Sequence, residues 1–466
     1  MGSDHPKEAC GLFGVYAPDE EVAHLTFFGL YALQHRGQES AGMAVSDGTN
    51  ILVFRELGLV SQVFSERSLA SLQGHLCIGH TRYSTTGSTT WENAQPTFKT
   101  AGRGGLALGH NGNLVNTGEL AAEVGERGPA TTDSDLVSTL LARRMVDASL
   151  EEAALHVLPR LSGAFSFVML DERTLYGARD PHGLRPLGIG RLPGGGWVLA
   201  SETAALDVVG ATYVREVEPG ELVGIDDRGL RSMRFAEAPR PALCLFEFVY
   251  LGRADSRMYG RSLHEARREM GRQLAREAPV EADMVVPVPD TATSAAQGYA
   301  EVSGIPYGDG LMKNRYIGRT FIEPTPALRQ RGVKLKLNPL PDAVRGRRLV
   351  VVDDSIVRGT TTRQIVQVLR ETGAVEVHLR ITSPPVRWPC FYGIDMSTRG
   401  ELVAAGREVD EVRDFVGADS LAYLSLGALV ATTQAPKGAF CRACFDGEYP
   451  IPVGEREPSK FALETG

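Results

Sequence analysis

Short apolar segments separated by glycine-rich turns dominate the first half of the chain. They cover residues 11–17, 41–45, 51–54, 165–170 and 197–200. Runs of this length bounded by glycine predict β-strands. One helix is predicted over 21–34, where apolar residues recur on one side: Val22, Leu25, Phe28, Leu30 and Leu33. We therefore expect residues 10–235 to form a mainly β, layered α+β domain.

The pattern changes after residues 236–241, a proline- and charge-rich stretch that we interpret as a linker. From about residue 263, helical periodicity alternates with short, wholly apolar segments. Helices are predicted over 263–276 and 364–371, and strands over 283–289, 349–352 and 375–381. A strand–loop–helix–strand order of this length is a βαβ unit, which requires a parallel sheet. The second domain is therefore predicted to be α/β.

Composition restricts the class of protein. The 466 residues suggest two or three domains, and 43% apolar residues provide enough material for real cores. Lys+Arg 49 against Asp+Glu 57 gives a net charge of −8, which argues against a non-specific nucleic-acid binder or a membrane-surface protein. The N-terminus lacks a signal peptide's apolar stretch, and no apolar run is long enough to span a bilayer. We expect a cytoplasmic protein.

Two adjacent carboxylates, Asp353 and Asp354, end the apolar strand that begins at Leu349. Ligands of open α/β sheets bind outside the carboxyl ends of strands. The loop that follows supplies polar groups before the next helix, which favours a phosphate site: Ser355, Arg358, Gly359, Thr360 and Thr361. An ordinary capped strand end is the alternative. A P-loop is disfavoured, because its lysine signature is missing.

This run closely resembles the signature of phosphoribosyltransferases. The resemblance implies that the acids bracket the ribose of phosphoribosyl pyrophosphate (PRPP) and that the loop holds its 5′-phosphate. A second strand end, at Thr291, resembles the family's pyrophosphate loop. Together Thr291, Asp353 and Asp354 would hold Mg²⁺. Residues 313–320, which include Lys313 and Arg319, are either a solvated loop or a flap over the pyrophosphate.

Cys10 precedes an apolar strand, and a lone cysteine there is usually core. Three polar segments change this interpretation: residues 34–39, 79–85 and 109–114. Together with Cys10 they resemble the glutamine-hydrolysing domain of N-terminal-nucleophile amidotransferases. In that family the cysteine becomes the first residue and its own α-amine is the general base. An α-amine suits this role, because its pKa lies near working pH.

The resemblance assigns roles residue by residue. Cys10 would be the nucleophile, and residues 1–9 a propeptide. Asn111 and the Gly112 N–H would form the oxyanion hole. Arg82 would bind the glutamine α-carboxylate and Asp133 its α-ammonium, while Arg36 would position groups near the nucleophile.

Six cysteines in a chain of this length do not form a secreted disulfide scaffold. Cys77 lies within an apolar strand and is predicted to be core. Four others can ligate zinc or an iron–sulfur cluster, and spacing alone favours zinc: Cys244, Cys390, Cys441 and Cys444. Their sequence contexts resemble the [4Fe–4S]-containing, Bacillus-type amidophosphoribosyltransferases, in which the cluster would be structural or regulatory.

The resemblance to amidophosphoribosyltransferases runs from Cys10 to about Pro452. It implies an α+β N-terminal-nucleophile hydrolase domain of layered αββα form, followed by an α/β phosphoribosyltransferase domain with a parallel sheet. The implied segments are a propeptide (1–9), a glutaminase domain (10–235), a linker segment with one cluster cysteine (236–262), a phosphoribosyltransferase domain (263–440) and a C-terminal segment with the C-x-x-C ligands (441–466).

The implied reaction converts glutamine, PRPP and water into 5-phosphoribosylamine, glutamate and pyrophosphate, with ammonia channelled between two sites. It opens purine synthesis. The family further implies Mg²⁺ and [4Fe–4S] as cofactors, purine nucleotides as feedback inhibitors and a homotetramer. Two alternatives are a non-catalytic phosphoribosyl-binding regulator and an amidotransferase that aminates a sugar phosphate. The intact Cys10 segment disfavours the first, and the acidic strand disfavours the second.

Overall fold

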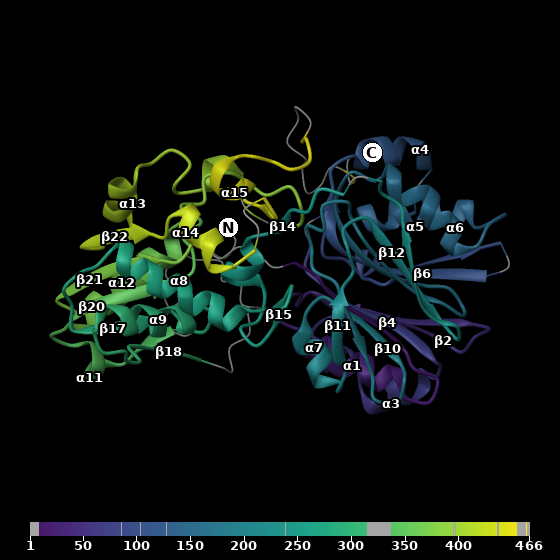
Figure 1. Ribbon diagram of the computed structural model, residues 1–466, viewed down its shortest axis with the longest axis horizontal. Coiled ribbons are helices and arrows are strands. Elements are labelled where there is room, and N and C mark those ends of the chain that lie inside the picture. The colour runs from purple at the N-terminus through teal and green to yellow at the C-terminus, as the bar shows by residue number, and fades with distance from the viewer. Residues whose placement is uncertain are drawn as a thin grey trace.

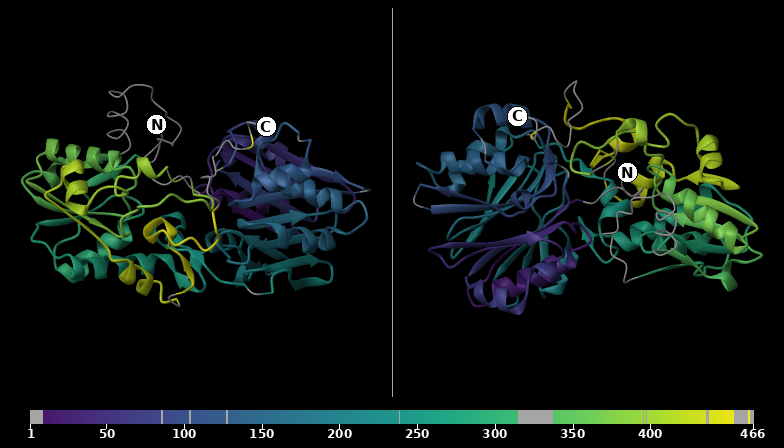
Figure 2. Two further views of the ribbon diagram at one scale, coloured as in Figure 1. Left: turned by 90° about the horizontal axis from the view of Figure 1, so that it is seen from above. Right: turned by 180° about the vertical axis from the view of Figure 1, so that it is seen from behind.

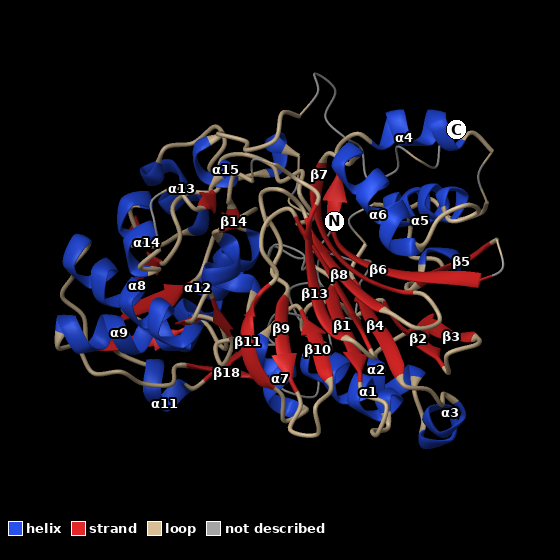
Figure 3. Ribbon diagram, turned by 45° about the vertical axis from the view of Figure 1, so that its right-hand side comes forward, coloured by secondary structure: helices blue, strands red, loops and turns tan. Residues whose placement is uncertain are grey.

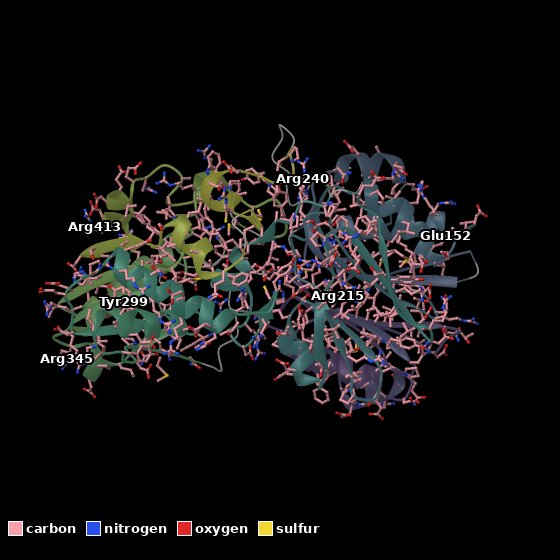
Figure 4. The ribbon with its side chains drawn as sticks, in the orientation of Figure 1. Glu152, Arg215, Arg240, Tyr299, Arg345 and Arg413 are labelled. Atoms are coloured by element: carbon pink, nitrogen blue, oxygen red, sulfur yellow. The ribbon has the colours of Figure 1, made fainter. Side chains whose placement is uncertain are left out.

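The computed structural model describes residues 9–84, 86–102, 104–126, 128–237, 239–314, 337–394, 396, 398–435, 438–453 and 463. The chain forms two halves that lie side by side in each view (Figures 1 and 2). The chain passes between them near Arg240, labelled in Figure 4. There the Arg240 N–H donates to the Pro181 carbonyl oxygen at 3.0 Å, which ties the crossing segment to the first half.

Two antiparallel sheets make up the centre of the first half. In the described residues the first sheet has seven strands, in the order β11 (Thr212–Glu216), β9 (Gly188–Arg191), β10 (Trp197–Ala200), β1 (Gly11–Tyr16), β4 (Leu76–Arg82), β2 (Ser40–Ser46) and β3 (Ile51–Leu57). The second has six, in the order β13 (Gly229–Arg234), β12 (Glu221–Asp226), β8 (Leu175–Arg179), β7 (Gly163–Leu170), β6 (Gly104–Leu114) and β5 (Thr97–Ala101).

Alternation along β1 explains why these sheets stack. Leu12 points into the core between the two sheets, whereas Phe13 and Val15 pack against the helices on the outer face. Successive side chains of a strand point to opposite sides, so β1 buries one face between the two sheets and the other face under the helices. Cys77 on β4 belongs to the helix-facing core and is fully buried, as predicted.

Helices cover the outer face of each sheet, which gives the predicted αββα layers (Figure 3). The first sheet carries α1 (Val22–Ala32), α2 (Val60–Val63), α3 (Glu66–Ser71) and α7 (Thr203–Val208). The second carries α4 (Thr117–Val124), α5 (Asp133–Arg144) and α6 (Leu150–Val157).

The apolar side predicted for the first helix was wrong in part. Phe28 is 50% exposed, and the buried face of α1 is made by smaller residues such as Ala23, Thr26 and Gly29. A Cβ at Gly29 would lie 2.3 Å from the Phe13 ring, so the helix approaches the sheet too closely for larger side chains. Because α1 is apolar on all sides, periodicity could not identify the face that packs.

The second half contains a parallel sheet, in the order β17 (Met284–Pro287), β20 (Arg348–Asp353), β21 (Glu376–Ile381) and β22 (Ser420–Tyr423). Along β20, Val350 and Val352 face one core while Leu349 and Val351 face the other. The helices that accompany it are α8 (Leu263–Glu277), α9 (Thr293–Ser303), α11 (Pro341–Val344), α12 (Thr360–Thr372), α13 (Val409–Val416) and α14 (Leu426–Thr432). The predicted α/β character is confirmed.

Short elements lie where the halves meet. Strand β14 (Leu243–Cys244) pairs in parallel with β23 (Phe440–Cys441), which leads into α15 (Ala443–Asp446). After β14 a π-helical turn covers Glu247–Leu251, and the apolar residues of this segment join the core of the second half.

Two small antiparallel ribbons complete the described strands. They are β15 (Arg257–Met258) with β16 (Arg261–Ser262), and β18 (Leu311–Lys313) with β19 (Leu337–Pro339). Among the described residues, every helix is too short or too polar to cross a bilayer.

Candidate functional site

Cys10 lies immediately before β1 and is buried. Its Sγ donates to the Tyr83 carbonyl oxygen at 3.4 Å, and its own carbonyl oxygen accepts from Arg36 Nε at 3.1 Å. Burial raises the pKa of the Cys10 thiol to about 11, although the Tyr83 hydrogen bond and the Arg82 charge act in the opposite direction. The thiol is therefore protonated near neutral pH and needs a base before it can attack.

His35 precedes Arg36 in the sequence and is paired with a carboxylate rather than with the Cys10 thiol. Its Nε2 lies 2.7 Å from Glu202 Oε1, and the charged groups that act on the Cys10 thiol are Arg82, Glu39 and Asp133. An α-amine on Cys10 itself would lie on the same residue as the thiol. This arrangement favours the N-terminal-base chemistry expected from the sequence.

Asn111 lies on β6, and its side chain is fully buried. In the described part of the structure, neither its amide nitrogen nor its amide oxygen has a hydrogen-bond partner. Leaving such a group unpaired costs about 1–3 kcal/mol, so a partner supplied by a ligand is expected. The next residue, Gly112, has φ +144°, and a Cβ there would lie 2.1 Å from the Ala164 carbonyl oxygen. Only glycine fits that position.

Arg82 ends β4 with its side chain 2% exposed. Its guanidinium donates to the carbonyl oxygens of Thr86 and Ser88, and burial lowers its pKa. Asp133 begins α5 and accepts from the backbone N–H groups of Leu114 and Ser134 at 3.0 and 2.9 Å. A buried cation and a buried anion thus both lie within electrostatic reach of the thiol.

Burial alone would raise the pKa of the Asp133 carboxyl. His110, whose Nδ1 lies 3.6 Å from Asp133 Oδ1, and the two N–H donors outweigh burial and hold the pKa below its ordinary value. Asp133 therefore carries its negative charge in the buried site. It can pair with a cationic ligand group without first losing a proton.

A buried ionic network, which the sequence did not predict, surrounds the Arg36 side chain. It consists of Arg36, Arg185, Glu202 and Glu247. Arg36 contacts Glu202 at 2.6 Å and Glu247 at 2.9 Å, and Arg185 contacts Glu247 at 3.4 Å. Each of these side chains is at most 1% exposed. With its donors occupied in this way, Arg36 is suited to hold the Cys10 carbonyl group rather than substrate.

One sequence signal could have found this network. Glu247 is a single acid within the apolar run 242–251. A charged residue in such a run is almost never fully buried unless it is paired, so a buried cation partner was to be expected. The identity of the partner depends on the fold, because Arg36 lies 211 residues earlier in the chain.

In the second half, Asp353 and Asp354 lie at the carboxyl end of β20 and are 2% and 3% exposed. Asp353 Oδ1 accepts from the Asp354 N–H at 2.9 Å, and Asp354 Oδ1 accepts from Ser355 Oγ at 2.6 Å. Burial, together with the charge of Asp354, raises the pKa of Asp353 well above its ordinary value. A bound cation would relieve this repulsion, and carboxylate oxygens are suitable Mg²⁺ ligands.

The loop that follows leads into the N-terminus of α12. Gly359 caps the helix with φ +78°, which glycine adopts without strain. Thr360 is exposed, Thr361 and Arg358 are half-buried, and Arg358 NH2 lies 3.3 Å from Glu401 Oε2. Backbone N–H groups at the start of a helix favour a phosphate, and the phosphate site at this loop stays a prediction.

The loop at Thr291, which is predicted to bind pyrophosphate, begins next to these acids. Strands β17 and β20 pair in parallel, with Pro287 opposite Val352, so the loop at Thr291 begins at the same sheet edge as Asp353. Thr291 is half-buried. Lys313 is exposed and contacts Asp290 at 2.5 Å. Arg319 lies outside the described residues, as do residues 1–8 of the predicted propeptide.

The four candidate ligand cysteines gather where the two halves meet. Cys244 and Cys441 are register partners in the β14–β23 pair. The pKa of Cys444 is raised by burial and also by Cys244, Cys441 and Cys390, so the four thiols lie within electrostatic reach of one another. Among the described residues, no group of three or more His, Cys, Asp or Glu side chains is arranged to hold a single metal ion.

Comparison with known proteins identifies the family and agrees with the two-domain fold. A family model described as "Glutamine amidotransferase domain" matches residues 80–208. The amidophosphoribosyltransferase of Mycobacterium tuberculosis (strain ATCC 25618 / H37Rv) is 60% identical over 460 residues, which cover 96% of this chain and 87% of the relative. That of Bacillus subtilis (strain 168) is 46% identical over 454 residues, which cover 96% of this chain and 95% of the relative.

A solved structure extends the similarity to the fold. Glutamine phosphoribosylpyrophosphate (PRPP) amidotransferase from B. subtilis, complexed with ADP and GMP, aligns with a TM-score of 0.90 at 45% identity. The alignment covers 96% of this chain and 98% of that chain, so both predicted domains are matched in order. The chain therefore belongs to the amidophosphoribosyltransferase family, the enzymes of the first step of purine biosynthesis.

Proposed function

We propose that glutamine is hydrolysed at Cys10 and that the released ammonia aminates PRPP at the acidic edge of the parallel sheet. The observation that carries the first half of this proposal is the buried amide of Asn111, which has no hydrogen-bond partner among the residues that the structure describes. A polar group that lacks a partner in the free protein is suited to bind charge that develops only during the reaction.

The proposed glutaminase reaction starts with proton transfer from the Cys10 thiol to the Cys10 α-amine. The sulfur attacks the glutamine amide carbon, and the carbonyl oxygen becomes an oxyanion held by the Asn111 side-chain NH₂ and the Gly112 N–H. The tetrahedral intermediate collapses to a γ-glutamyl thioester as the α-ammonium protonates the leaving nitrogen. Water, deprotonated by the same amine, then releases glutamate and restores the thiol.

Glutamine recognition is assigned to Arg82 and Asp133. Their opposite charges match the α-carboxylate and the α-ammonium of an amino acid, and both act on the Cys10 thiol electrostatically. A bidentate pair with a buried guanidinium fixes both the position and the orientation of a carboxylate. We assign Arg36 to hold the Cys10 main chain through its bond to the carbonyl oxygen.

Replacing Asn111 by Ala should lower the glutaminase kcat about 10²- to 10³-fold, the usual effect of removing one oxyanion-hole donor. The KM for glutamine should change little, because Arg82 and Asp133 remain. The matched control is Asn116→Ala, since Asn116 Nδ2 donates to the Arg160 carbonyl oxygen on the exposed side of the same domain. Equal glutaminase rates in the two variants would remove Asn111 from the mechanism.

For the second site we assign Asp353 and Asp354 to the ribose hydroxyls of PRPP and Ser355, Gly359 and the adjacent threonines, Thr360 and Thr361, to its 5′-phosphate. The two acids and Thr291 would hold Mg²⁺, which neutralises charge on the departing pyrophosphate. Lys313, and Arg319 beyond the described residues, would add positive charge. Arg358 would complete the phosphate loop.

Ammonia transfer through the protein interior is the third part of the proposal. Ala9, the neighbour of Cys10, is 1% exposed and belongs to the core of the second half, so the nucleophile lies at the junction of the halves. The carboxylates of Asp354, Glu202 and Glu247 all act electrostatically on the buried Arg267 guanidinium. These influences support an ammonia route that would run through buried protein rather than solvent.

We also propose that Cys244, Cys390, Cys441 and Cys444 bind a [4Fe–4S] cluster, as the Bacillus-type resemblance implies. The four thiols lie within electrostatic reach of one another, and a four-iron cluster separates its ligands farther than a single zinc ion does. Burial raises the pKa of Cys244 to about 11, so cluster binding would displace protons from the thiols. Its role would be structural or regulatory, because the reaction transfers no electrons.

Protein purified without oxygen should be brown and contain about four irons per chain. Cys441→Ser should lose the colour and unfold more readily, since metal-binding energy is folding energy. The control is Cys77→Ala, which removes a buried thiol from a different core and should keep the iron. A colourless, zinc-containing enzyme with full activity would contradict the cluster.

The remaining family properties complete the proposal. Residues 1–9 would be removed to free the Cys10 α-amine. Purine nucleotides would inhibit, since the related B. subtilis structure is described as a complex with ADP and GMP. The assembly would be a homotetramer in the cytoplasm.

A further inference from the structure

We infer that a loop of the second half, residues 390–394, holds the oxyanion hole of the first half in place, with Gly393 as a positioning residue for glutamine hydrolysis. The inference rests on the assignment of Asn111 and Gly112 proposed above. It adds a requirement that the glutaminase residues alone do not reveal, because the loop lies far away in sequence and follows β21 of the parallel sheet.

The closest contact joins two glycine backbones. Gly393 has φ +99°, and a Cβ at this position would lie 2.8 Å from the carbonyl carbon and 2.9 Å from the Cα of Gly112. Real Cβ atoms essentially never approach backbone so closely. The main chain of the loop therefore lies directly against the Cα and carbonyl group of Gly112, the residue whose N–H is expected to form half of the oxyanion hole.

Two further groups of the first half hold the same loop. Asn113 Nδ2, one residue beyond Gly112, donates to the Phe391 carbonyl oxygen at 3.0 Å. Arg185 Nε and NH2 both donate to the Tyr392 carbonyl oxygen, at 3.1 and 2.8 Å. Three successive loop residues thus contact the first half, and two of the contacts are with Gly112 and its neighbour.

The loop is fixed from its other side as well. The Tyr392 side chain is buried and shares a small core with Ala164 and Ile451, and its hydroxyl accepts from the Ile451 N–H at 3.1 Å. Ala164 is also the residue whose carbonyl oxygen faces Gly112. Gly112 is therefore enclosed between β7 on one side and the loop on the other, which restricts the orientation of its N–H.

The variant that tests this is Gly393→Ala in the full-length, processed enzyme. The new methyl group must displace Gly112, and a misplacement of about 1 Å in a catalytic site can cost about 10²-fold in rate. We expect the glutaminase kcat to fall by about that factor, while the KM for glutamine changes less than about threefold. Ammonia-dependent synthesis should persist, because the acids of β20 are untouched.

The matched control is Gly417→Ala. Gly417 has φ +78°, so alanine there meets a similar backbone penalty, but apart from its chain neighbours no described atom lies within 4 Å of the position of its Cβ. Its glutaminase kcat should stay within about twofold of the parent enzyme. Equal losses in the two variants, or a Gly393→Ala enzyme whose ammonia-dependent synthesis falls in parallel, would overturn the inference.

Asn113→Asp gives a second, milder test if Gly393→Ala does not fold. It keeps an oxygen for the hydroxyl of Thr86 but loses the donor to the Phe391 carbonyl oxygen. We expect about a tenfold lower glutaminase kcat with an unchanged KM, and a kcat equal to that of the parent would refute the role of the loop. Asn111→Ala separates the two proposals: if it is fully active the oxyanion hole is misassigned, and if it alone is impaired only the loop inference fails.

Discussion

Replacing Cys10 by Ala is expected to abolish phosphoribosylamine synthesis from glutamine while synthesis from added ammonia continues. The variant removes the sulfur nucleophile, the thiol that contacts the Tyr83 carbonyl oxygen and lies within reach of the charges of Arg82 and Asp133. The acids at β20 lie in the other half and keep their environment. Initial rates measured with glutamine and with a high concentration of ammonium at alkaline pH separate the two activities.

Asp354→Ala is the reciprocal control. It should lower synthesis with either nitrogen source, because it removes a charged acceptor worth about 1.5–3 kcal/mol, or roughly 10- to 150-fold, from PRPP binding. Its basal glutaminase should survive. A Cys10→Ala enzyme that still uses glutamine would overturn the assignment of the nucleophile.

Replacing Glu247 by Gln is expected to reduce the free energy of unfolding by about 3–5 kcal/mol, the usual effect of breaking a fully buried ion pair. Glu247 is the residue of the buried ionic network that contacts both Arg36 and Arg185. Without its charge, Arg36 keeps its pair with Glu202, but the buried Arg185 guanidinium loses the carboxylate that it contacts. The urea midpoint and slope of the full-length enzyme give the change.

The control for this result is Glu218→Gln. Glu218 pairs with Arg234, but both side chains are 54% exposed, and exposed pairs contribute at most about 1 kcal/mol. The contrast between a buried and an exposed glutamate, each facing arginine, isolates the effect of burial. If the two variants unfolded at the same urea concentration, the network would not be a source of stability.

The sequence was sufficient for the parts of this fold that depend on local pattern. Strand β10 was predicted with its observed limits, and β20 and β21 within one residue at each end. Glycine at position 373 ends α12 with φ +107°, the left-handed conformation that is common just after the last turn of a helix. The local pattern predicts a βαβ unit, and the residues that follow its apolar strand must lie at the carboxyl end of that strand. Asp353 and Asp354 lie there.

What could not be predicted depends on contacts between distant segments. Glu202 and Glu247 belong to different halves, and the sequence around each of them does not indicate its partner. Likewise, nothing near Gly393 in sequence indicates that Gly112 lies against it. Periodicity also gave the wrong face locally, in α1. This apolar helix has Phe28 exposed and has no polar side that would indicate which face is turned to solvent.

The contact between the loop at residues 390–394 and the oxyanion hole also has a consequence for the order in which the enzyme is made. Asn113 and Phe391 are 278 residues apart in sequence. A ribosome that has completed the entire glutaminase sequence has not yet synthesised the loop that supports it. A nascent or truncated chain that ends before Gly393 is therefore expected to hydrolyse little glutamine. Translation itself would delay the release of ammonia until the segment that carries the PRPP site has been synthesised.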